Sequence, residues 1–189
     1  MRLFIAVDLK KRSKRLLRSK FEIIKKGIDE DLKWVEQYKW HITIKFLGEL
    51  NNKKVKDIKE LIKASSQNIN SFYLQLSGLK AFPNANYPKV LYINIKRGKK
   101  ELTEIHDNFD KQLEKFGFDR DERGFNPHLT LARVKRNSDK NIIADSFGKL
   151  NDDIFINIFS RVDKISLIKS ELTVSGPIYT EIFTNNLLF

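Results

Sequence analysis

A short motif, His-x-Thr, occurs twice in this chain and constrains its fold more than any other feature. The two copies read HITI at residues 41–44 and HLTL at residues 128–131, so that His41 and His128 lie 87 residues apart. Because the chain has only 3 histidines in 189 residues, two such matches fit chance poorly. Both copies lie in segments whose apolar residues alternate, which is the pattern of a half-buried β-strand.

The elements predicted around the two motifs repeat in the same order: strand, helix, motif strand, helix, strand. Hydrophobic periodicity predicts strands at residues 2–9, 40–47, 72–80, 89–96, 127–134, 153–159, 162–169 and 172–182, and helices at residues 10–28, 52–64, 99–116 and 138–149. We therefore expect a single domain over residues 1–189, made of two pseudo-symmetric lobes that face each other and contribute one motif each.

The spacing within each motif has a geometric meaning in a strand. Residues i and i+2 point to the same face of a strand, about 6.6 Å apart. His41 and Thr43 therefore share one face, and His128 and Thr130 share another. If the two lobes face each other, two imidazoles and two hydroxyls converge on one cleft.

Such a cleft is suited to acid–base chemistry on a phosphodiester. Imidazole changes its charge near neutral pH, so one ring can accept a proton from water while the other donates one to a leaving oxygen. Threonine hydroxyls can hydrogen-bond the non-bridging phosphate oxygens, and none of these steps requires a metal. The alternative, in which each histidine is a core residue bonded to its own threonine, explains one copy better than two matched copies.

Charge and composition agree with this chemistry and exclude others. The net charge of +12 favours a polyanionic partner such as RNA, and the absence of cysteine excludes disulfides, cysteine-ligated metals and thiol catalysis. Asp8 interrupts the first apolar stretch too early for a signal peptide, and no run approaches the ~20 apolar residues of a membrane span. We expect a cytoplasmic monomer that does not bind membranes.

The residues around the motifs resemble a known family. The chain is similar to the 2H phosphoesterase superfamily, named for two His-x-Thr-x motifs, and most resembles its RNA 2',3'-cyclic phosphodiesterases, also called 2'-5' RNA ligases. The resemblance includes MRLFIAVDL at the start, WHITIKFLGEL around the first motif and FNPHLTLARVK around the second. Ser170, Gly176 and Tyr179 also fit the end of the family pattern.

This resemblance implies a fold, a reaction and roles for the motif residues. The fold is a bilobal α+β structure with two antiparallel sheets that flank a central cleft and helices on the outside. The reaction is hydrolysis of an RNA or nucleoside 2',3'-cyclic phosphate to a 2'-phosphomonoester, with no cofactor. By resemblance, His41 is the proton donor and His128 the proton acceptor, and Thr43 and Thr130 bind the phosphate. The two motifs are chemically alike, so the residues alone do not tell donor from acceptor.

Lys45 and Arg133 are further candidates for contact with the phosphate. Simple alternation places Lys45, four residues after His41, on the face of that histidine, and the alternative is a solvated lysine. Arg133 resembles the second-motif arginine of the family, but its offset of five residues from His128 sends it to the opposite face. A β-bulge or the end of the strand would have to turn it inward.

The third histidine, His106, is expected on the surface of its helix. Some aromatic residues near the motifs could stack on a base, although aromatic residues beside strands more often belong to the core. These residues are Trp34, Tyr38, Trp40 and Phe125.

Three other functions remain open at this point. A 2'-5' ligase would run the same chemistry in reverse, and no Gly-x-x-x-x-Gly-Lys loop for nucleotide-driven ligation is present in the sequence. A non-catalytic RNA-binding module would need the charge and the aromatic residues but not the histidine pair. A histidine-based metal site is the weakest alternative, because the sequence shows no clear carboxylate partner at metal-ligand spacing.

Overall fold

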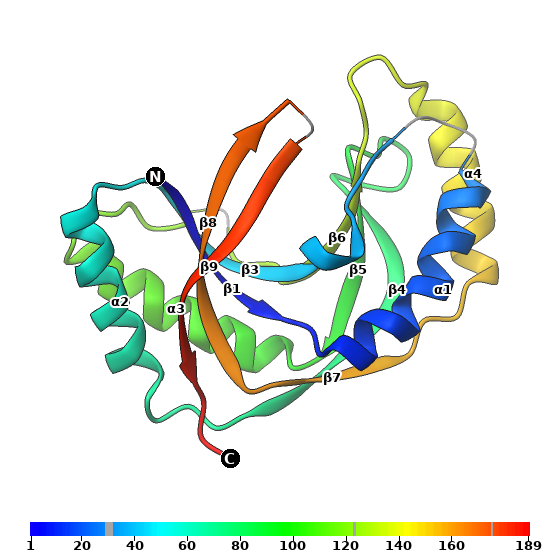
Figure 1. The fold of residues 1–189 in the computed structure, drawn as a ribbon. Helices are drawn as coiled ribbons and strands as arrows, with labels where there is room; N and C mark the ends of the chain where they lie inside the picture. The colour runs from blue at the N-terminus through cyan, green and yellow to red at the C-terminus, as the bar shows by residue number, and fades with distance from the viewer. Residues whose placement is uncertain (29–31, 123, 175) are drawn as a thin grey trace.

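The described residues of the chain form two antiparallel β-sheets with helices on their outer sides (Figure 1). The computed structural model describes residues 1–28, 32–122, 124–174 and 176–189. The predicted α+β class with two antiparallel sheets is therefore confirmed. Among the described residues, no helix is both long enough and apolar enough to cross a membrane.

The first sheet carries the first motif. Its strands lie in the order β3-β1-β8-β9, and all neighbours are antiparallel. Their bounds are Arg2–Asp8 for β1, His41–Glu49 for β3, Lys164–Thr173 for β8 and Gly176–Asn186 for β9. Figure 1 shows the β8–β9 hairpin rising past β1 and β3.

The second sheet carries the second motif. Its strands lie in the order β2-β6-β5-β4-β7, again antiparallel throughout. Their bounds are Lys33–Trp34 for β2, Phe72–Phe82 for β4, Val90–Arg97 for β5, His128–Arg133 for β6 and Ile158–Val162 for β7.

The helices cover the backs of the two sheets in pairs. They are α1 at Lys11–Gly27, α2 at Asn52–Ser66, α3 at Lys99–Glu114 and α4 at Lys140–Asp153, with a 3-10 turn at Gln37–Lys39. The helices α2 and α3 pack together beside the first sheet, and α1 and α4 pack together beside the second (Figure 1). The predicted amphipathic pattern explains α1, where Leu17, Phe21 and Ile24 are buried and most of the basic residues are exposed.

The four strands of the first sheet correspond in order to four strands of the second, and each sheet takes strands from both halves of the sequence. The strands β3 and β1 occupy the places in the first sheet that β6 and β5 occupy in the second. The next place is filled by β8 in the first sheet and by β4 in the second, so the halves of the chain exchange a strand. The helix α1 shows the same exchange, because it follows β1 of the first sheet along the chain but packs against β7 of the second sheet. This exchange supports our proposal that residues 1–189 form one domain with two pseudo-symmetric lobes.

The predicted boundaries fail mainly near the C-terminal half of the chain. The strand predicted at residues 153–159 is wrong, because α4 continues to Asp153 and β7 begins only at Ile158. The reason is that Leu150 and Ile154 continue the helical apolar spacing of Ile143 and Phe147 against the core, and the N–H of Ile154 still donates to the carbonyl oxygen of Leu150. The last strand also runs further than predicted, to Asn186.

Substitution of Gly98 tests the backbone geometry at the start of α3. It has a φ of +84°, and a Cβ at this position would lie 2.5 Å from Leu74 Cδ2 and 2.8 Å from the carbonyl oxygen of Tyr73. We expect Gly98→Ala to lower the free energy of unfolding by about 1–3 kcal/mol, because both the conformation and the contact are unfavourable for alanine. Urea denaturation measures this change.

Gly148, inside α4, provides the matched control. A Cβ at Gly148 would have no heavy atom within 4 Å. We therefore expect Gly148→Ala to raise the free energy of unfolding by about 0.5–1 kcal/mol, because alanine loses less entropy than glycine in a helix. Equal stability of the Gly98→Ala variant and the unmodified protein would contradict the geometry described for Gly98.

Candidate active site

His41 is the first residue of β3, and contacts on several sides hold its ring. Its Nδ1 lies 2.6 Å from the carbonyl oxygen of Lys39, and its Nε2 lies 3.0 Å from Oγ1 of Thr43. Phe4 stacks on the ring at a centroid distance of 4.8 Å, and Tyr179 approaches it edge-on at 5.4 Å. These contacts fix both the position and the orientation of the imidazole.

His128 is held in a closely similar way at the start of β6. Its Nδ1 lies 2.8 Å from the carbonyl oxygen of Asn126, which precedes it by two residues as Lys39 precedes His41. Two aromatic rings pack edge-on against the imidazole, Phe82 at 4.9 Å and Tyr92 at 5.1 Å. The duplication therefore extends from the motif to the backbone carbonyl that anchors each histidine.

The carbonyl anchors determine which ring nitrogen is available for chemistry. A carbonyl oxygen only accepts hydrogen bonds, so Nδ1 of each histidine must donate. In a neutral ring, Nε2 then carries the lone pair, and in His41 it accepts a hydrogen bond from the Thr43 hydroxyl. In both histidines, Nε2 is therefore the ring nitrogen that is available for proton transfer.

A β-bulge directly after Thr43 changes the faces of the residues that follow in β3. Thr43 and Lys45 pair with adjacent residues of β1, so two residues of β3 lie opposite one. The bulge reverses the alternation, and Phe46 rather than Lys45 returns to the face of His41. The predicted placement of Lys45 on that face is wrong: its side chain is 4% exposed and is ion-paired with Asp110. Lys45 lines the edge of a wide depression that Thr43 and His128 also line, but its ammonium is held by Asp110.

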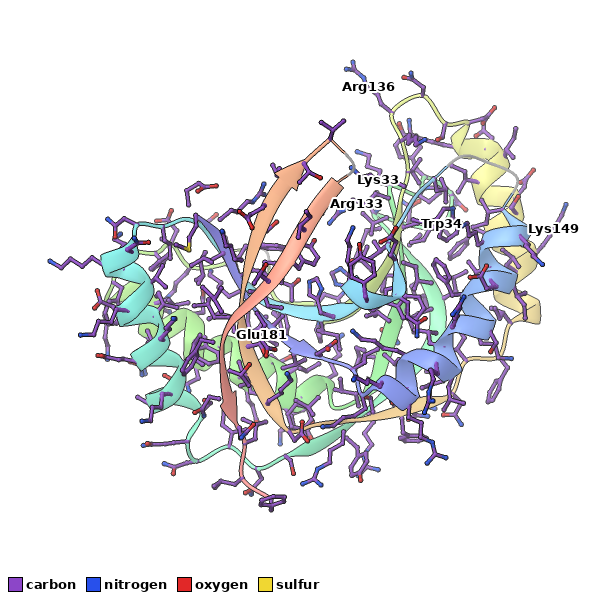
Figure 2. The ribbon with its side chains drawn as sticks, viewed as in Figure 1. Lys33, Trp34, Arg133, Arg136, Lys149 and Glu181 are labelled. Atoms are coloured by element: carbon purple, nitrogen blue, oxygen red, sulfur yellow. The ribbon has the colours of Figure 1, made fainter. Side chains whose placement is uncertain are left out.

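The strand β6 contains the same bulge at the matching position. Thr130 and Ala132 pair with adjacent residues of β5, and Arg133 then turns to the face of His128. The bulge that sequence reasoning required for Arg133 is thus present. Arg133 follows Phe46 by 87 residues, so the two occupy equivalent positions in the duplicated strands. Figure 2 shows Arg133 and Lys33 on the wall formed by β2 and β6, facing the β8–β9 hairpin.

The two motif strands meet at a cavity of about 320 Å³. All four motif residues line it together with Arg133, and the other lining residues are Val35, Lys39, Phe46, Phe82, Val90 and Tyr179. The structure therefore brings together, from two different sheets, two imidazoles, two hydroxyls and a guanidinium.

Burial sets the protonation of both imidazoles. Burial lowers the pKa of His41 below its ordinary value, more than the hydrogen bond to the Lys39 carbonyl raises it. Burial also lowers the pKa of His128, and the positive charge of Arg133 lowers it further, against the hydrogen bond to the Asn126 carbonyl. Both rings are therefore neutral at neutral pH in this structure.

Sequence reasoning missed several residues around the cavity. Tyr179 entered the sequence analysis only as part of a family pattern, and its contact with His41 depends on the β8–β9 hairpin. Phe46, whose side chain is largely exposed, stands at the rim of the cavity. The sequence signal that could have found Phe46 is its spacing of 87 residues from Arg133, the same spacing as between the two motifs. This spacing points to the cavity only when the bulges are known.

The other predicted candidates have structural roles. The prediction that His106 lies on the helix surface is wrong, because it is 3% exposed and stacks on Phe125 at 4.3 Å. Trp34 and Trp40 both pack against Phe21 in the core. Tyr38 is exposed and does not line the cavity between the motifs.

Comparison with known families agrees with this geometry. The model of the 2'-5' RNA ligase superfamily matches residues 24–173 of the chain. The chain belongs to this superfamily. Its relatives include the RNA 2',3'-cyclic phosphodiesterase of Methanocaldococcus jannaschii, which is 37% identical over 180 residues, 95% of this chain and 96% of its own. The enzyme of the same name from Methanothermobacter thermautotrophicus is 33% identical over 184 residues, 96% of both chains. The resemblance predicted from the motifs is confirmed.

Solved structures show the same fold in other proteins. A protein of Thermus thermophilus matches with a TM-score of 0.79 and 22% identity, covering 99% of this chain and 98% of its own. E. coli LigT in complex with 3'-AMP matches with a TM-score of 0.77 and 19% identity, covering 98% and 97%. These matches confirm the fold over nearly the whole chain.

The lowered pKa values can be measured directly, because the chain has only 3 histidines. We expect the ring signals of His41 and His128 to titrate below the ordinary histidine pKa of about 6.5, since burial disfavours the charged rings. Histidine-selective NMR over a pH series measures both midpoints, and His41→Asn and His128→Asn variants assign the signals. A midpoint above the ordinary value for either ring would contradict the burial described here.

Proposed function

We propose that this member of the superfamily is a metal-independent hydrolase of 2',3'-cyclic phosphodiesters on RNA ends or nucleosides, and that it yields 2'-phosphomonoesters. The observation that carries the proposal is the convergence of two matched His-x-Thr motifs, one from each sheet, on a single cavity. The two relatives that are RNA 2',3'-cyclic phosphodiesterases, at 33% and 37% identity, support the same activity for this chain.

The cavity offers complementary groups for a cyclic phosphate. The hydroxyls of Thr43 and Thr130 are placed to donate hydrogen bonds to its non-bridging oxygens. Arg133 and Lys39 line the same cavity and supply positive charge, which favours an anion there. These groups position the phosphorus between the two imidazoles.

The surroundings leave room for the nucleoside that carries the phosphate. A wider depression of about 1260 Å³ shares Phe46, Phe82 and His128 with the cavity, so the two are continuous. The largely exposed ring of Phe46 offers an apolar surface at the junction. The net charge of +12 favours an RNA chain over a neutral substrate.

The two histidines divide the proton transfers. We assign His128 as the base and His41 as the acid by resemblance to the family. Nε2 of His128 takes a proton from a water molecule as the water oxygen bonds to phosphorus. The bond from phosphorus to O3' breaks, and Nε2 of His41 gives its proton to O3'. The product is a 2'-phosphomonoester with a free 3'-hydroxyl, and exchange of protons with solvent returns both rings to their starting states.

The hydrogen bond between Thr43 and His41 links substrate binding to protonation. In this structure the Thr43 hydroxyl donates to Nε2 of His41, which is possible only while that nitrogen is unprotonated. A bound phosphate anion stabilises the imidazolium and so raises the pKa of His41. Protonation of Nε2 frees the Thr43 hydroxyl to donate to the phosphate, and the acid and the phosphate contact form together.

A metal-based mechanism has one candidate site among the described residues, and its contacts argue against it. Ligand atoms of His106, Asp110 and Asp121 lie within 4.8 Å of one another. However, the ammonium of Lys45 already contacts both carboxylates and supplies the positive charge that a metal would bring. None of these residues lines the cavity between the motifs.

Substitution of either histidine tests the proposed mechanism. We expect His41→Ala and His128→Ala each to lower kcat on a 2',3'-cyclic nucleotide by ~10²–10⁴-fold, because each removes one proton transfer. Activity of the unmodified protein should survive a chelator. Undiminished turnover in either variant would contradict the paired-histidine mechanism, and loss of activity in the chelator would contradict metal independence.

Product analysis separates the proposed reaction from the other candidate functions. We expect a 2'-phosphate from a cyclic nucleotide, because O3' is the leaving group, and chromatography distinguishes it from the 3'-phosphate. Incubation of a 2',3'-cyclic RNA end with a 5'-hydroxyl RNA shows whether joining exceeds hydrolysis, as a ligase requires. Undiminished RNA affinity in the double histidine variant, with no turnover by the unmodified protein, would indicate a binding module.

The lowered pKa values also predict the pH dependence of the rate. The profile of kcat/KM reports the groups of the free enzyme, so its optimum should lie below about pH 6.5. Its acid limb comes from protonation of His128 and its alkaline limb from deprotonation of His41. Because bound phosphate raises the pKa of His41, the alkaline limb of kcat should lie at higher pH than that of kcat/KM. Rates measured across the pH range would contradict this if the order of the two limbs were reversed.

A further inference from the structure

Lys45 is a buried cation whose three donors all have partners. Its Nζ lies 2.5 Å from Oδ1 of Asp110, 3.0 Å from the carbonyl oxygen of Asp119 and 3.1 Å from Oδ2 of Asp121. An ammonium group has three hydrogen-bond donors, so these three acceptors satisfy it. The ammonium of Lys45 therefore makes a complete set of contacts outside the cavity between the motifs, although the residue lines the wider depression beside it.

The partners of Lys45 connect it to the loop that leads into the second motif. Asp110 belongs to α3, whereas Asp119 and Asp121 belong to the loop that joins α3 to β6. The backbone N–H of Asp121 also donates to Oδ2 of Asp110 at 3.3 Å. Lys45 itself lies on β3, two residues after Thr43, so a residue of the first motif strand contacts the loop before the second.

His106 and Phe125 provide a second attachment for the same loop. Nε2 of His106 lies 3.1 Å from Oδ2 of Asp121, and the His106 ring is stacked within 3° of parallel on the Phe125 ring. Burial would raise the pKa of the Asp121 carboxyl, but the hydrogen bonds from His106 and Lys45 outweigh it and the pKa is lowered. Asp121 is thus an anion that joins Lys45 to His106.

The loop ends at the groups that orient His128. The carbonyl oxygen of Asn126 accepts the hydrogen bond from Nδ1 of His128, and the neighbouring Phe125 is the residue stacked on His106. A displacement of the loop would therefore move the anchor of the imidazole. Because Nδ1 of the ring is tied to that carbonyl, the direction of Nε2 would change as well.

We propose that Lys45 is a positioning residue for His128. From β3 of the first sheet, it holds the loop that leads to His128 of the second sheet, and so it sets the geometry between the two motifs. The proposal rests on the proposed function, in which His128 is the base. The bulge in β3 makes the contact possible, and the equivalent position in β6 is Ala132, which cannot make the reverse contact.

The physics of buried charges explains why the loss of Lys45 should act on the loop. Removal of one partner from a buried ion pair leaves the other charge uncompensated, which is strongly unfavourable. Without Lys45, the side chain of Asp110, which is 12% exposed, would have to gain water. Movement of the loop toward solvent provides this water, and a displacement of about 1 Å at a reacting group can lower a rate by ~10²-fold.

Replacement of Lys45 tests the proposal through kinetics. We expect Lys45→Met to lower kcat by about 10- to 100-fold while KM stays within about three-fold, because Thr43, Thr130 and Arg133 still bind the phosphate. The matched control is Lys100→Met, which removes the same charge from an exposed ion pair with Glu104 on α3. This control should leave kcat within about two-fold.

A spectroscopic measurement distinguishes positioning from a general loss of stability. In histidine-selective NMR, Lys45→Met should shift or broaden the His128 ring signal, whereas Lys100→Met should leave it in place. Both spectra are recorded well below the melting temperature of each variant. A folded Lys45→Met protein with an unchanged His128 signal and an unchanged kcat would overturn the proposal.

Asp121→Ala keeps the proposal testable if Lys45→Met does not fold. Asp121 has a side chain that is 50% exposed, so its removal is compatible with folding but breaks the contacts to both Lys45 and His106. We expect a smaller fall in kcat, about 3- to 10-fold, together with a shifted His128 signal. The control is Glu104→Ala on α3, which removes the same charge from an exposed position outside the depression and should change neither. An unchanged His128 signal in a folded Asp121→Ala protein would overturn the proposal.

The two proposals fail in different ways. If the unmodified protein does not hydrolyse a 2',3'-cyclic nucleotide, the proposed function fails, and the NMR comparison still decides whether Lys45 holds His128 in place. If the unmodified protein is active and the Lys45 and Asp121 variants match it in kcat and in the His128 signal, only the positioning role fails.

Discussion

The β-bulge that follows each threonine decides which side chains share the site. In a regular strand, Lys45 would face the cavity and Arg133 would face away from it. One inserted residue in β3 and another in β6 reverse both outcomes. The cavity gains a guanidinium that can bind phosphate, and the ammonium of Lys45 moves to the buried carboxylate of Asp110. The bulge, which occurs once in β3 and once in β6, therefore determines that Arg133 lines the cavity and that Lys45 is buried away from it.

The sheets hold the two motif strands in one unit by exchanging strands. The strand β8, from late in the chain, completes the sheet of the first motif, and β4, from early in the chain, completes the sheet of the second. Each motif strand therefore belongs to a sheet that is built from both halves of the sequence. The Lys45 contacts add a direct link between them at the side-chain level, since they join β3 to the loop that leads to β6. The distance between the two imidazoles thus depends on both the sheet topology and a buried ion cluster.

The electrostatics of the site differ from those of the whole chain. The net charge of +12 attracts anions over a wide area, but the two imidazoles are neutral because burial lowers the pKa of each. Neutral rings suit a resting site in which one histidine must accept a proton. In the proposed mechanism, the other ring acquires its proton when an anionic phosphate is bound, so the substrate itself creates the charge that the reaction needs.

The sequence by itself determined the elements that depend on local pattern. The amphipathic helices, most of the strands and the shared faces of His41 with Thr43 and of His128 with Thr130 follow from periodicity, because they depend only on neighbours along the chain. Only the tertiary structure decided the rest. The bulges that reversed Lys45 and Arg133 arise from pairing with β1 and β5, and the burial of His106 arises from its stacking on Phe125. The strand exchange likewise depends on which sheet edge each strand meets. These features are contacts between segments far apart in the chain, and no local spacing encodes such contacts.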